Sequence, residues 1–362
     1  MSVSSDSTAS MSPPTSFPVI AEIDVGKGPE GLALDLDGRR GFVCCSRSNQ
    51  ITVFDLDTHE VLAHVGVGQE PIGIQYDPVA KRVLTADARS DTITVIDGVS
   101  LEVVGKVPVG EYPAGLLLYG ERRKLYSGNT AAGSVTVIDA DSLEVLTTVP
   151  AKLGAGSIAV DVVRDLVYCV NFVDGTITVI DGESNQAVRE LRLGEAPCKI
   201  AIDATRSRAY VPNSLVPTIS VVDLTTSEVI EVLQVDGAPV GMALGKGGRR
   251  VYAVDRSAGA VNVVDCETGS SWAHIPVGTG PGDIVVDPDT DTLYVSNAGS
   301  STVSVLRDGL EEAPPGAHGR AVSPLVGRRL PPFKLPDMVT GELRTSEEWQ
   351  GKKYIVNFFA SW

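Results

Sequence analysis

The feature that most constrains the fold of this chain is a repeat with a constant step of 42 residues. The repeat is marked by the runs ITVFD, ITVID, VTVID, ITVID, ISVVD and VNVVD, which end at Asp55, Asp97, Asp139, Asp181, Asp223 and Asp265, and by VSVLR, which ends at Arg307. A second column keeps the same step through Pro29, Pro71, Pro113, Ala155, Pro197, Pro239 and Pro281. Seven copies without an insertion indicate a modular repeat protein.

Each copy contains four segments that are typical of β-strands. In the first copy these are GLALD, GFVCCS, ITVFD and EVLAHV, which are rich in apolar and β-branched residues and are separated by turns such as Asp-Gly. Four strands in about 42 residues are the signature of a propeller blade. The sequence therefore predicts an all-β, seven-bladed β-propeller.

The ends of the repeat predict how the ring closes. The segment FPVIAEIDV, residues 17–25, lies 42 residues before HEVLAHVGV, so it corresponds to an outer strand that has no blade of its own. The last copy supplies only three strands. The N-terminal strand is therefore expected to complete the seventh blade and leave no free edge. We assign 1–16, rich in Ser, Thr and Pro, to a disordered tail and 17–307 to the propeller.

The repeat resembles the YVTN family of seven-bladed β-propellers, whose pattern is VG-x-x-P-x-G…D…Y-V…V-x-V-I-D. The resemblance covers about residues 17–307. The fourth copy departs from the pattern, with AKLGAGS at residues 151–157 in place of the VGxxP turn. This departure predicts a rim of different shape at the fourth blade.

Charge and composition exclude several classes of partner. A net charge of −16 and a pI near 4.7 argue against nucleic acid and against acidic lipid surfaces. No apolar run reaches the length of a membrane span, and the first 20 residues lack the basic and apolar regions of a signal peptide. As written, the chain is therefore expected to be cytoplasmic, and a misassigned start codon would make it extracytoplasmic.

No cofactor or metal is predicted. The five cysteines form neither CxxC nor a zinc-site spacing with the four histidines, and no CxxCH haem site occurs. Cys169 falls in a column of small strand residues and is expected to be buried. Cys198 lies near the expected channel mouth and is the one thiol whose reactivity we would test. The aspartates that end the VxVID runs are expected to cap the turns that follow them.

Candidate binding residues come from the columns that one face of a propeller brings to the channel mouth. They are Glu30, Arg47, Arg89, Lys199, Arg256 and Asp283. One interpretation is a shallow funnel of mixed charge that binds an acidic small molecule or a peptide, with the three arginines as anion contacts. The alternative, favoured by the uniformly short loops, is a solvated rim. A rim enzyme acting through Glu30, Lys199 or Asp283 is a third possibility.

The C-terminal part has a different character. Residues 308–326 are rich in Pro, Gly and charge and are assigned to a linker. Residues 327–362 resemble the opening of the thioredoxin-like redoxin family. The resemblance rests on Gly327, Pro332, Phe333, Leu335, Asp337, Gly341, Gly351, Lys352, Phe358, Ala360 and Trp362. It implies an incomplete α/β thioredoxin-like segment, with a hairpin near its start and a nucleophilic cysteine expected directly after Trp362.

Three explanations fit an ending at this position: a truncated sequence, a degenerate remnant, or a selenocysteine encoded by UGA. The leading functional hypothesis is a propeller docking platform fused to a thiol–disulfide oxidoreductase or peroxidase, which would need a thiol electron donor. The chain of 362 residues itself is expected to lack that activity. The alternative is a non-enzymatic binding or scaffold protein that takes an unknown small molecule or protein at the channel mouth.

Overall fold

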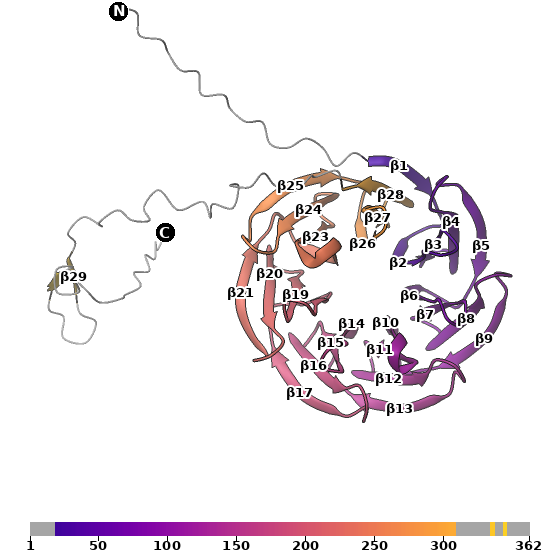
Figure 1. Cartoon of the computed structure of the whole chain (residues 1–362), viewed down its shortest axis with the longest axis horizontal. Helices are drawn as coiled ribbons and strands as arrows, with labels where there is room; N and C mark the ends of the chain where they lie inside the picture. The colour runs from indigo at the N-terminus through magenta and orange to yellow at the C-terminus, as the bar shows by residue number, and fades with distance from the viewer. Residues whose placement is uncertain (1–18, 309–333, 337–342, 346–362) are drawn as a thin grey trace, which may run out of the picture. The chain divides into compact units, whose positions relative to one another are not determined.

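The computed structural model describes residues 19–308, 334–336 and 343–345 of the chain. Seven four-stranded antiparallel sheets follow one another in chain order around a central channel, as Figure 1 shows from a viewpoint along the channel. In each blade the first strand lies at the channel and the last strand lies at the outer rim. The predicted all-β, seven-bladed propeller is confirmed.

The first three blades use consecutive strands. Blade 1 consists of β2 (Pro29–Asp35), β3 (Arg40–Cys45), β4 (Gln50–Asp55) and β5 (Val61–Gly66). Blade 2 consists of β6 (Pro71–Asp77), β7 (Arg82–Asp87), β8 (Thr92–Asp97) and β9 (Val103–Pro108). Blade 3 consists of β10 (Pro113–Tyr119), β11 (Lys124–Asn129), β12 (Ser134–Asp139) and β13 (Val145–Pro150), with the short 3-10 helix η1 (Gly120–Arg122) after β10.

The next three blades repeat this order. Blade 4 consists of β14 (Ala155–Asp161), β15 (Leu166–Asn171), β16 (Thr176–Asp181) and β17 (Ala187–Arg192). Blade 5 consists of β18 (Ala201–Asp203), β19 (Arg208–Asn213), β20 (Thr218–Asp223) and β21 (Glu228–Gln234). Blade 6 consists of β22 (Pro239–Leu244), β23 (Arg250–Asp255), β24 (Ala260–Asp265) and β25 (Ser271–Pro276), with the 3-10 helix η2 (Lys246–Gly248) after β22.

Blade 7 is completed by the N-terminal strand, as predicted. Its strands are β26 (Pro281–Asp287), β27 (Thr292–Asn297), β28 (Thr302–Arg307) and β1 (Val19–Asp24). β1 pairs antiparallel with β28 in a register that places Glu22 opposite Ser304, and the Ser304 hydroxyl donates a hydrogen bond of 3.2 Å to Glu22 Oε1. Because the first strand joins the last three, the ring has no unpaired blade at the junction of the chain ends.

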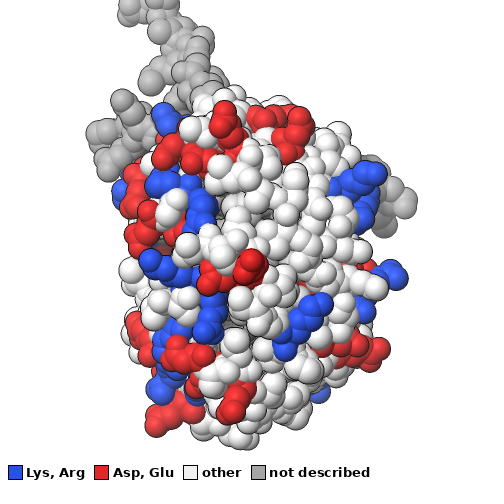
Figure 2. All heavy atoms as spheres, turned by 90° about the vertical axis from the view of Figure 1, so that its right-hand side faces the viewer, with Lys and Arg blue, Asp and Glu red and all other residues white. Residues whose placement is uncertain are grey.

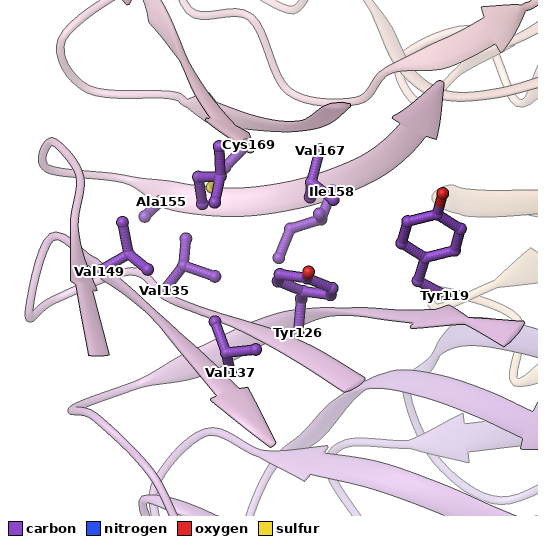
Figure 3. Packing of buried hydrophobic residues seen from close by; sticks show 10 residues of the cluster. Tyr119, Tyr126, Val135, Val137, Val149, Ala155, Ile158, Val167 and Cys169 are labelled. Atoms are coloured by element: carbon purple, nitrogen blue, oxygen red, sulfur yellow. The ribbon is translucent and has the colours of Figure 1, made fainter. Parts of the chain in front are cut away.

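The hydrophobic core is divided into seven clusters, each between two neighbouring blades. Figure 3 shows the cluster between blades 3 and 4, in which Tyr126 lies close to Ile158, and Cys169 belongs to the same cluster. The prediction that Cys169 is a small buried side chain is confirmed, since it is fully buried. The largest buried side chains again follow the 42-residue step: Phe42, Leu84, Tyr126, Tyr168, Tyr210, Tyr252 and Tyr294.

The aspartates that end the third strands cap the next turn, which confirms that prediction. The Asp55 carboxylate accepts hydrogen bonds from the amides of Asp57 (2.9 Å) and Thr58 (2.7 Å). Amides of the same turn bind Asp97, Asp139, Asp181, Asp223 and Asp265. These amide donors hold the pKa of Asp55 below its usual range, because they favour the ionised carboxylate.

A polar network links the second and third strands of most blades. Four asparagines at the end of the second strand donate both Nδ2 protons to two hydroxyls on the third strand: Asn129, Asn171, Asn213 and Asn297. The corresponding residue of blade 2 is Asp87, which is fully buried and accepts hydrogen bonds from the hydroxyls of Thr85 (2.9 Å) and Thr94. Blade 2 therefore places a carboxylate where four other blades place an amide.

The outer surface of the propeller carries few charges between its edges. Figure 2 shows the side on which β5 and β9 lie, where charged side chains gather in a band along one edge and the surface across the strands is mostly uncharged. Exposed apolar pairs, Val61–Leu62 and Val103–Val104, lie at the start of these outer strands. Among the described residues, no helix is both long enough and apolar enough to span a membrane.

The described part of the C-terminal unit is a hairpin. β29 (Lys334–Pro336) pairs antiparallel with β30 (Leu343–Thr345), so that Lys334 lies opposite Thr345. The predicted tail at 1–16, nearly all of the linker at 308–326 and the remainder of the redoxin-like segment at 327–362 lie outside the described residues. The hairpin agrees with the resemblance at the start of that segment, while a thioredoxin-like fold stays a prediction.

Candidate functional site

Glycines allow the inner strands to approach one another closely at one end of the channel, which we call the mouth. In four blades the third residue of the inner strand is a glycine: Gly31, Gly73, Gly115 and Gly241. A Cβ atom at Gly31 would lie 2.4 Å from the carbonyl oxygen of Ile72, and one at Gly241 would lie 2.3 Å from that of Gly282. Larger residues are therefore excluded at these positions by the backbone of the next blade.

The other three blades carry side chains at the same position, namely Ser157, Lys199 and Asp283, and these give the mouth its polar character. They line a cavity of about 440 Å³ together with Glu30 and Arg256. A ring of aliphatic residues, one from each blade, borders the same cavity: Leu32, Ile74, Leu116, Ile158, Ile200, Met242 and Ile284. Each of them is only 2–8% exposed and packs in one of the seven clusters between blades, so this ring serves mainly the core. What the cavity presents is therefore chiefly its charged groups of both signs.

The first of two ion pairs at the mouth joins blades 5 and 7. Lys199 Nζ lies 2.7 Å from Asp283 Oδ1, and the pair spans blade 6, whose residue in this column is Gly241. Asp283 is held in place, because its Oδ2 accepts a hydrogen bond of 3.4 Å from the Leu32 amide and its own amide donates to Ser296 Oγ at 3.0 Å. The carboxylate of Asp283 is therefore a fixed element of the site.

The second ion pair is looser and joins blade 1 to blade 6. Arg256 Nη2 lies 3.7 Å from Glu30 Oε2, and Arg256 Nε donates to the carbonyl of Pro281 at 3.3 Å. Burial raises the pKa of Glu30, an effect opposed by the charge of Arg256 and reinforced by Asp283. The two side chains are in contact without a direct hydrogen bond, so each keeps bonding capacity for a ligand.

Arg47 and Arg89 line a neighbouring polar cleft of about 460 Å³, which Glu30 also lines. Arg89 pairs with Glu70, whose Oε1 accepts a hydrogen bond of 2.7 Å from the Tyr112 hydroxyl. The Tyr112 hydroxyl and Arg89 lower the pKa of Glu70 despite its partial burial. Of the three arginines predicted for the site, Arg47 is the one that forms no ion pair with a described residue, whereas Arg89 pairs with Glu70 and Arg256 with Glu30.

Cys198 lines the cavity, but its environment disfavours the thiolate. Its Sγ lies 3.4 Å from the carbonyl oxygen of Pro239 and 3.3 Å from that of Val240. Burial raises the pKa of this thiol to about 12, although the positive charge of Lys199 acts to lower it. The thiol is therefore protonated and poorly nucleophilic at neutral pH. In the described part of the chain, no three His, Cys, Asp or Glu side chains gather as metal ligands.

The turn of blade 4 keeps the positive φ of the other blades but has hydrogen bonds of its own. Gly154 (φ 84°) corresponds to Gly28 (φ 65°) of blade 1, and β14 has seven residues, as β2 and β6 have. Because Ala155 stands where other blades have proline, its amide donates to the Lys152 carbonyl at 3.2 Å, and the Gly154 amide donates to the Thr130 carbonyl at 3.0 Å. The inner strand itself is irregular in the fifth blade. In blade 5 the inner strand β18 has only three residues.

Pro212 accounts for the short inner strand of blade 5. It lies on β19 beside Cys198, whose amide donates to its carbonyl at 3.2 Å, and as a proline it has no N–H to return to the inner strand. The backbone that carries Cys198 and Lys199 is consequently outside the regular sheet ladder. This gives the Lys199 side of the mouth fewer backbone constraints than the other six blades have.

The structure brings four of the six predicted site residues to one cavity. Glu30, Lys199, Arg256 and Asp283 line the central cavity, whereas Arg47 and Arg89 line the neighbouring cleft. Sequence reasoning missed the aliphatic ring, although its 42-residue step was a readable signal. It also missed Glu70 and Tyr112, because nothing in the repeat says which loop residues meet. That the six residues bind a ligand stays a prediction.

Comparison with known proteins supports the fold. No family model matches the chain, and no curated protein matches it. Among solved structures, a chain entitled Kuenenia stuttgartiensis Hydrazine Synthase is similar, with a TM-score of 0.73 and 18% sequence identity over 79% of this chain and 97% of that chain. At this level of identity the similarity concerns the fold alone. The fold and the mouth together define a seven-bladed β-propeller with a polar cavity at the end of its channel, an architecture suited to a binding or scaffold platform.

Proposed function

We propose that the propeller is a binding platform whose ligand site is the mouth of the central channel. The observation that carries this proposal is the cavity of about 440 Å³, into which the Lys199–Asp283 and Glu30–Arg256 pairs converge. Small-molecule sites typically have volumes of about 300–1,000 Å³ and a few converging polar groups. A rim that is only solvated needs no such convergence.

The ligand class differs from a simple anion. Arg89 and Arg256 already face the carboxylates of Glu70 and Glu30, and Lys199 faces Asp283. An acidic ligand bound to these groups would compete with a resident carboxylate in each case. The proposal that an acidic molecule binds in this region therefore rests mainly on Arg47, which lines the neighbouring cleft and has no such partner among the described residues.

The test is a ligand screen of the full chain by thermal shift with small charged and polar molecules. Hits are then titrated into wild type, into Lys199→Ala, Arg256→Ala, which removes the two cations of the mouth, and into Arg47→Ala, Arg89→Ala, which removes those of the neighbouring cleft. We expect the first double variant to lose most of the affinity. Unchanged affinity of that variant would refute the mouth as the site, and a loss confined to the second would place the site in the neighbouring cleft.

A second candidate function involves thiol–disulfide exchange by the C-terminal unit, with the propeller presenting a substrate to it. It is supported by the redoxin resemblance over 327–362 and by the β29–β30 hairpin within it. This part of the sequence contains no cysteine. The 362-residue chain is therefore expected to leave insulin disulfides and peroxides unreduced, and turnover of either would contradict this interpretation of the segment.

Membership of the YVTN family belongs to the same proposal. Its support is the pattern of glycine, proline, tyrosine and aspartate columns across seven copies. In the structure these columns have structural tasks: tyrosines fill the interfaces between blades, and aspartates cap turns. The family resemblance consequently supports the fold and names no ligand.

A further inference from the structure

Blades 4 and 5 expose large apolar side chains in the loops on the mouth side of the ring. In blade 4 these are Leu153, Phe172 and Val173, which are 53%, 42% and 64% exposed. Blade 5 adds Leu215, which is 71% exposed. We call these four residues the apolar corner. The two blades are neighbours in the ring, as Figure 1 shows, so the four side chains belong to one region of this face.

In blade 4 a close approach of two loops brings the apolar residues together. The Phe172 amide donates a hydrogen bond of 3.0 Å to the carbonyl of Gly154, the residue after Leu153. A Cβ atom at Gly154 would lie 2.5 Å from Val173 N, so only glycine permits this approach. The unusual loop sequence of blade 4 thus places Leu153 beside Phe172 and Val173.

Backbone contacts continue from this loop into blade 5. A Cβ atom at Gly175 would lie 2.5 Å from the carbonyl oxygen of Gly194, the residue from which the first loop of blade 5 continues. The Ser214 amide, directly before Leu215, donates to the carbonyl of Ala196 in that loop at 2.9 Å. The loops that carry the apolar corner are therefore packed against one another in sequence.

The apolar corner departs from the repeat. At the position of Leu153 the other six blades have polar residues or glycine: Lys27, Gln69, Glu111, Glu195, Gly237 and Thr279. At the position of Phe172 they have small or polar residues: Ser46, Ala88, Thr130, Ser214, Arg256 and Ala298. The fold therefore does not require large apolar side chains here. Because their exposure to water is unfavourable, a cluster of this kind is typical of a surface that a partner covers.

Charges beside the apolar corner favour a basic partner. Asp174 and Glu195 are exposed in the loops just described and form no ion pair with a described residue. Of the basic residues nearby, Lys152 already pairs with Glu190 at 3.5 Å, and Arg192 stands at the end of the outermost strand β17. The whole chain carries a net charge of −16. A partner with lysine or arginine next to apolar residues is attracted to this surface, whereas an acidic partner is repelled.

A second copy of the chain is disfavoured as the occupant. Two-fold docking of the apolar corner onto itself would bring Asp174 and Glu195 of one copy toward those of the other. Like charges that are partly desolvated in a contact oppose association. The net charge of −16 on each copy adds to this repulsion, and it also opposes contact with an anionic membrane.

From these observations we infer that the apolar corner is a docking surface for a basic, apolar segment of a partner protein, that is, a stretch in which aliphatic or aromatic residues lie next to lysine or arginine. The apolar side chains of that segment are covered by Phe172, Val173 and Leu215, and its basic side chains face Asp174 and Glu195. This inference goes beyond the proposed function, because the apolar corner is distinct from the cavity at the mouth.

The test is fluorescence anisotropy of three labelled peptides with the full chain, each acetylated and amidated so that only the side chains differ. KLFKLVK carries apolar and basic residues, ELFELVE carries the same apolar residues with acidic ones, and KSSKSSK keeps only the basic ones. We expect KLFKLVK to bind about tenfold or more tightly than either of the others. Its affinity should fall as the ionic strength rises.

Paired variants locate the site. Phe172→Ser with Leu215→Ser removes two apolar anchors and should weaken KLFKLVK binding about tenfold or more. The matched control is Val79→Ser with Val163→Ser, whose side chains are each 71% exposed and lie in the turns after β6 and β14, at the other end of these strands. This control should leave binding unchanged. Equal weakening by the two pairs would overturn the apolar corner as the place of binding.

The charge is tested without a change in bulk. Asp174→Asn with Glu195→Gln should weaken KLFKLVK binding and reduce its dependence on ionic strength. Equal affinity for KLFKLVK and ELFELVE, or failure of KLFKLVK to bind, would overturn the inference.

Two further measurements decide between occupants. A dimer in analytical ultracentrifugation that is lost in Phe172→Ser, Leu215→Ser would assign the apolar corner to a second copy and overturn the inference. Sedimentation with phosphatidylcholine vesicles that is lost in the same variant would assign it to a membrane, with the same consequence. The proposed function of the mouth is decided separately, by the screen hits and the variant Lys199→Ala, Arg256→Ala.

Discussion

Replacement of Asp87 by asparagine should stabilise the propeller. Blade 3 shows the arrangement that the variant would adopt. There Asn129 donates through Nδ2 to Ser134 Oγ (3.1 Å) and Thr136 Oγ1 (2.9 Å), and Ser127 Oγ donates to Asn129 Oδ1 (3.2 Å). In blade 2, the three positions that correspond to Ser127, Ser134 and Thr136 also carry hydroxyl groups, so the change of Asp87 to asparagine should complete an equivalent network.

The partner residues in blade 2 are Thr85, Thr92 and Thr94. The hydroxyls of Thr85 and Thr94 donate to the Asp87 carboxylate, whereas Thr92 Oγ1 is buried and, within the described residues, has no hydrogen-bond partner. A carboxylate has no proton to donate to Thr92, but an amide Nδ2 has two. A new hydrogen bond contributes about 0.5–1.5 kcal/mol net, and an unsatisfied buried polar group costs about 1–3 kcal/mol.

We expect Asp87→Asn to raise the free energy of unfolding by about 1–2 kcal/mol at pH 7. This corresponds to a rise of about 2–4 °C in Tm, measured by circular dichroism. The control is the reverse exchange in blade 3, Asn129→Asp, which buries a carboxylate and should destabilise. A variant Asp87→Asn that is no more stable than wild type at pH 7 would refute this reasoning.

The pH dependence gives the same prediction a second measurement. Burial raises the pKa of Asp87, although the hydrogen bonds from the hydroxyls of Thr94 and Thr85 act to lower it. The folded protein therefore holds this proton more tightly than the unfolded chain, whose aspartate has a pKa of about 3.9. The associated stability is present below that value and is lost as the pH rises through the folded pKa. The advantage of Asp87→Asn should accordingly be small near pH 3 and largest at neutral pH.

Four further predictions follow from the packing and from the titrating groups. Because burial raises the pKa of Glu30, binding of a cationic hit from the ligand screen in calorimetry should weaken as the pH falls through that raised value, and Glu30→Gln should abolish the dependence. Ile23→Ala in the closing strand, where the side chain is 3% exposed, should cost about 2–5 kcal/mol in urea unfolding, whereas Val19→Ala, 41% exposed, should cost little. Cys198, whose pKa burial raises to about 12, should resist iodoacetamide at pH 8 until the protein is unfolded, as followed by mass spectrometry. Amides of Ser100 and Val99 lower the pKa of Asp97, so Asp97→Ala should lower Tm at pH 7, and this loss should disappear as the pH falls through the lowered pKa, since the native cap is then protonated.

The repeat made the fold predictable because each column of the sequence occupies one structural position. The missing fourth strand of the last copy, for example, implied that residues 17–25 close the ring, and β1 does pair with β28. Periodicity also placed Lys199 and Asp283 near the mouth. It could not show that they pair across blade 6, because that contact depends on the reach and direction of the two side chains.

Deviations within a column were harder to interpret from the sequence. The absent proline at Ala155 was expected to change the rim of blade 4; there Gly154 keeps the positive φ of the turn, while the amide of Ala155 adds a hydrogen bond to the Lys152 carbonyl at 3.2 Å. A larger consequence comes from Pro212, which looks ordinary among the apolar residues of its strand. A proline on a strand matters only where an ordinary residue would have donated its N–H to a neighbouring strand, and at Pro212 that neighbour is β18. The apolar pattern of a strand does not reveal toward which neighbour each N–H points.

Closure of the ring by the first strand also sets a delay in biosynthesis. Glu22 must find Ser304, 282 residues later in the chain. At about 5–20 residues per second, the ribosome needs roughly 15–60 s to make the intervening segment. During this time β1 has no partner strand, and the six complete blades can form before the seventh. A nascent propeller of this kind therefore leaves its first strand available to chaperones, or to a strand of a neighbouring chain, until synthesis is nearly finished.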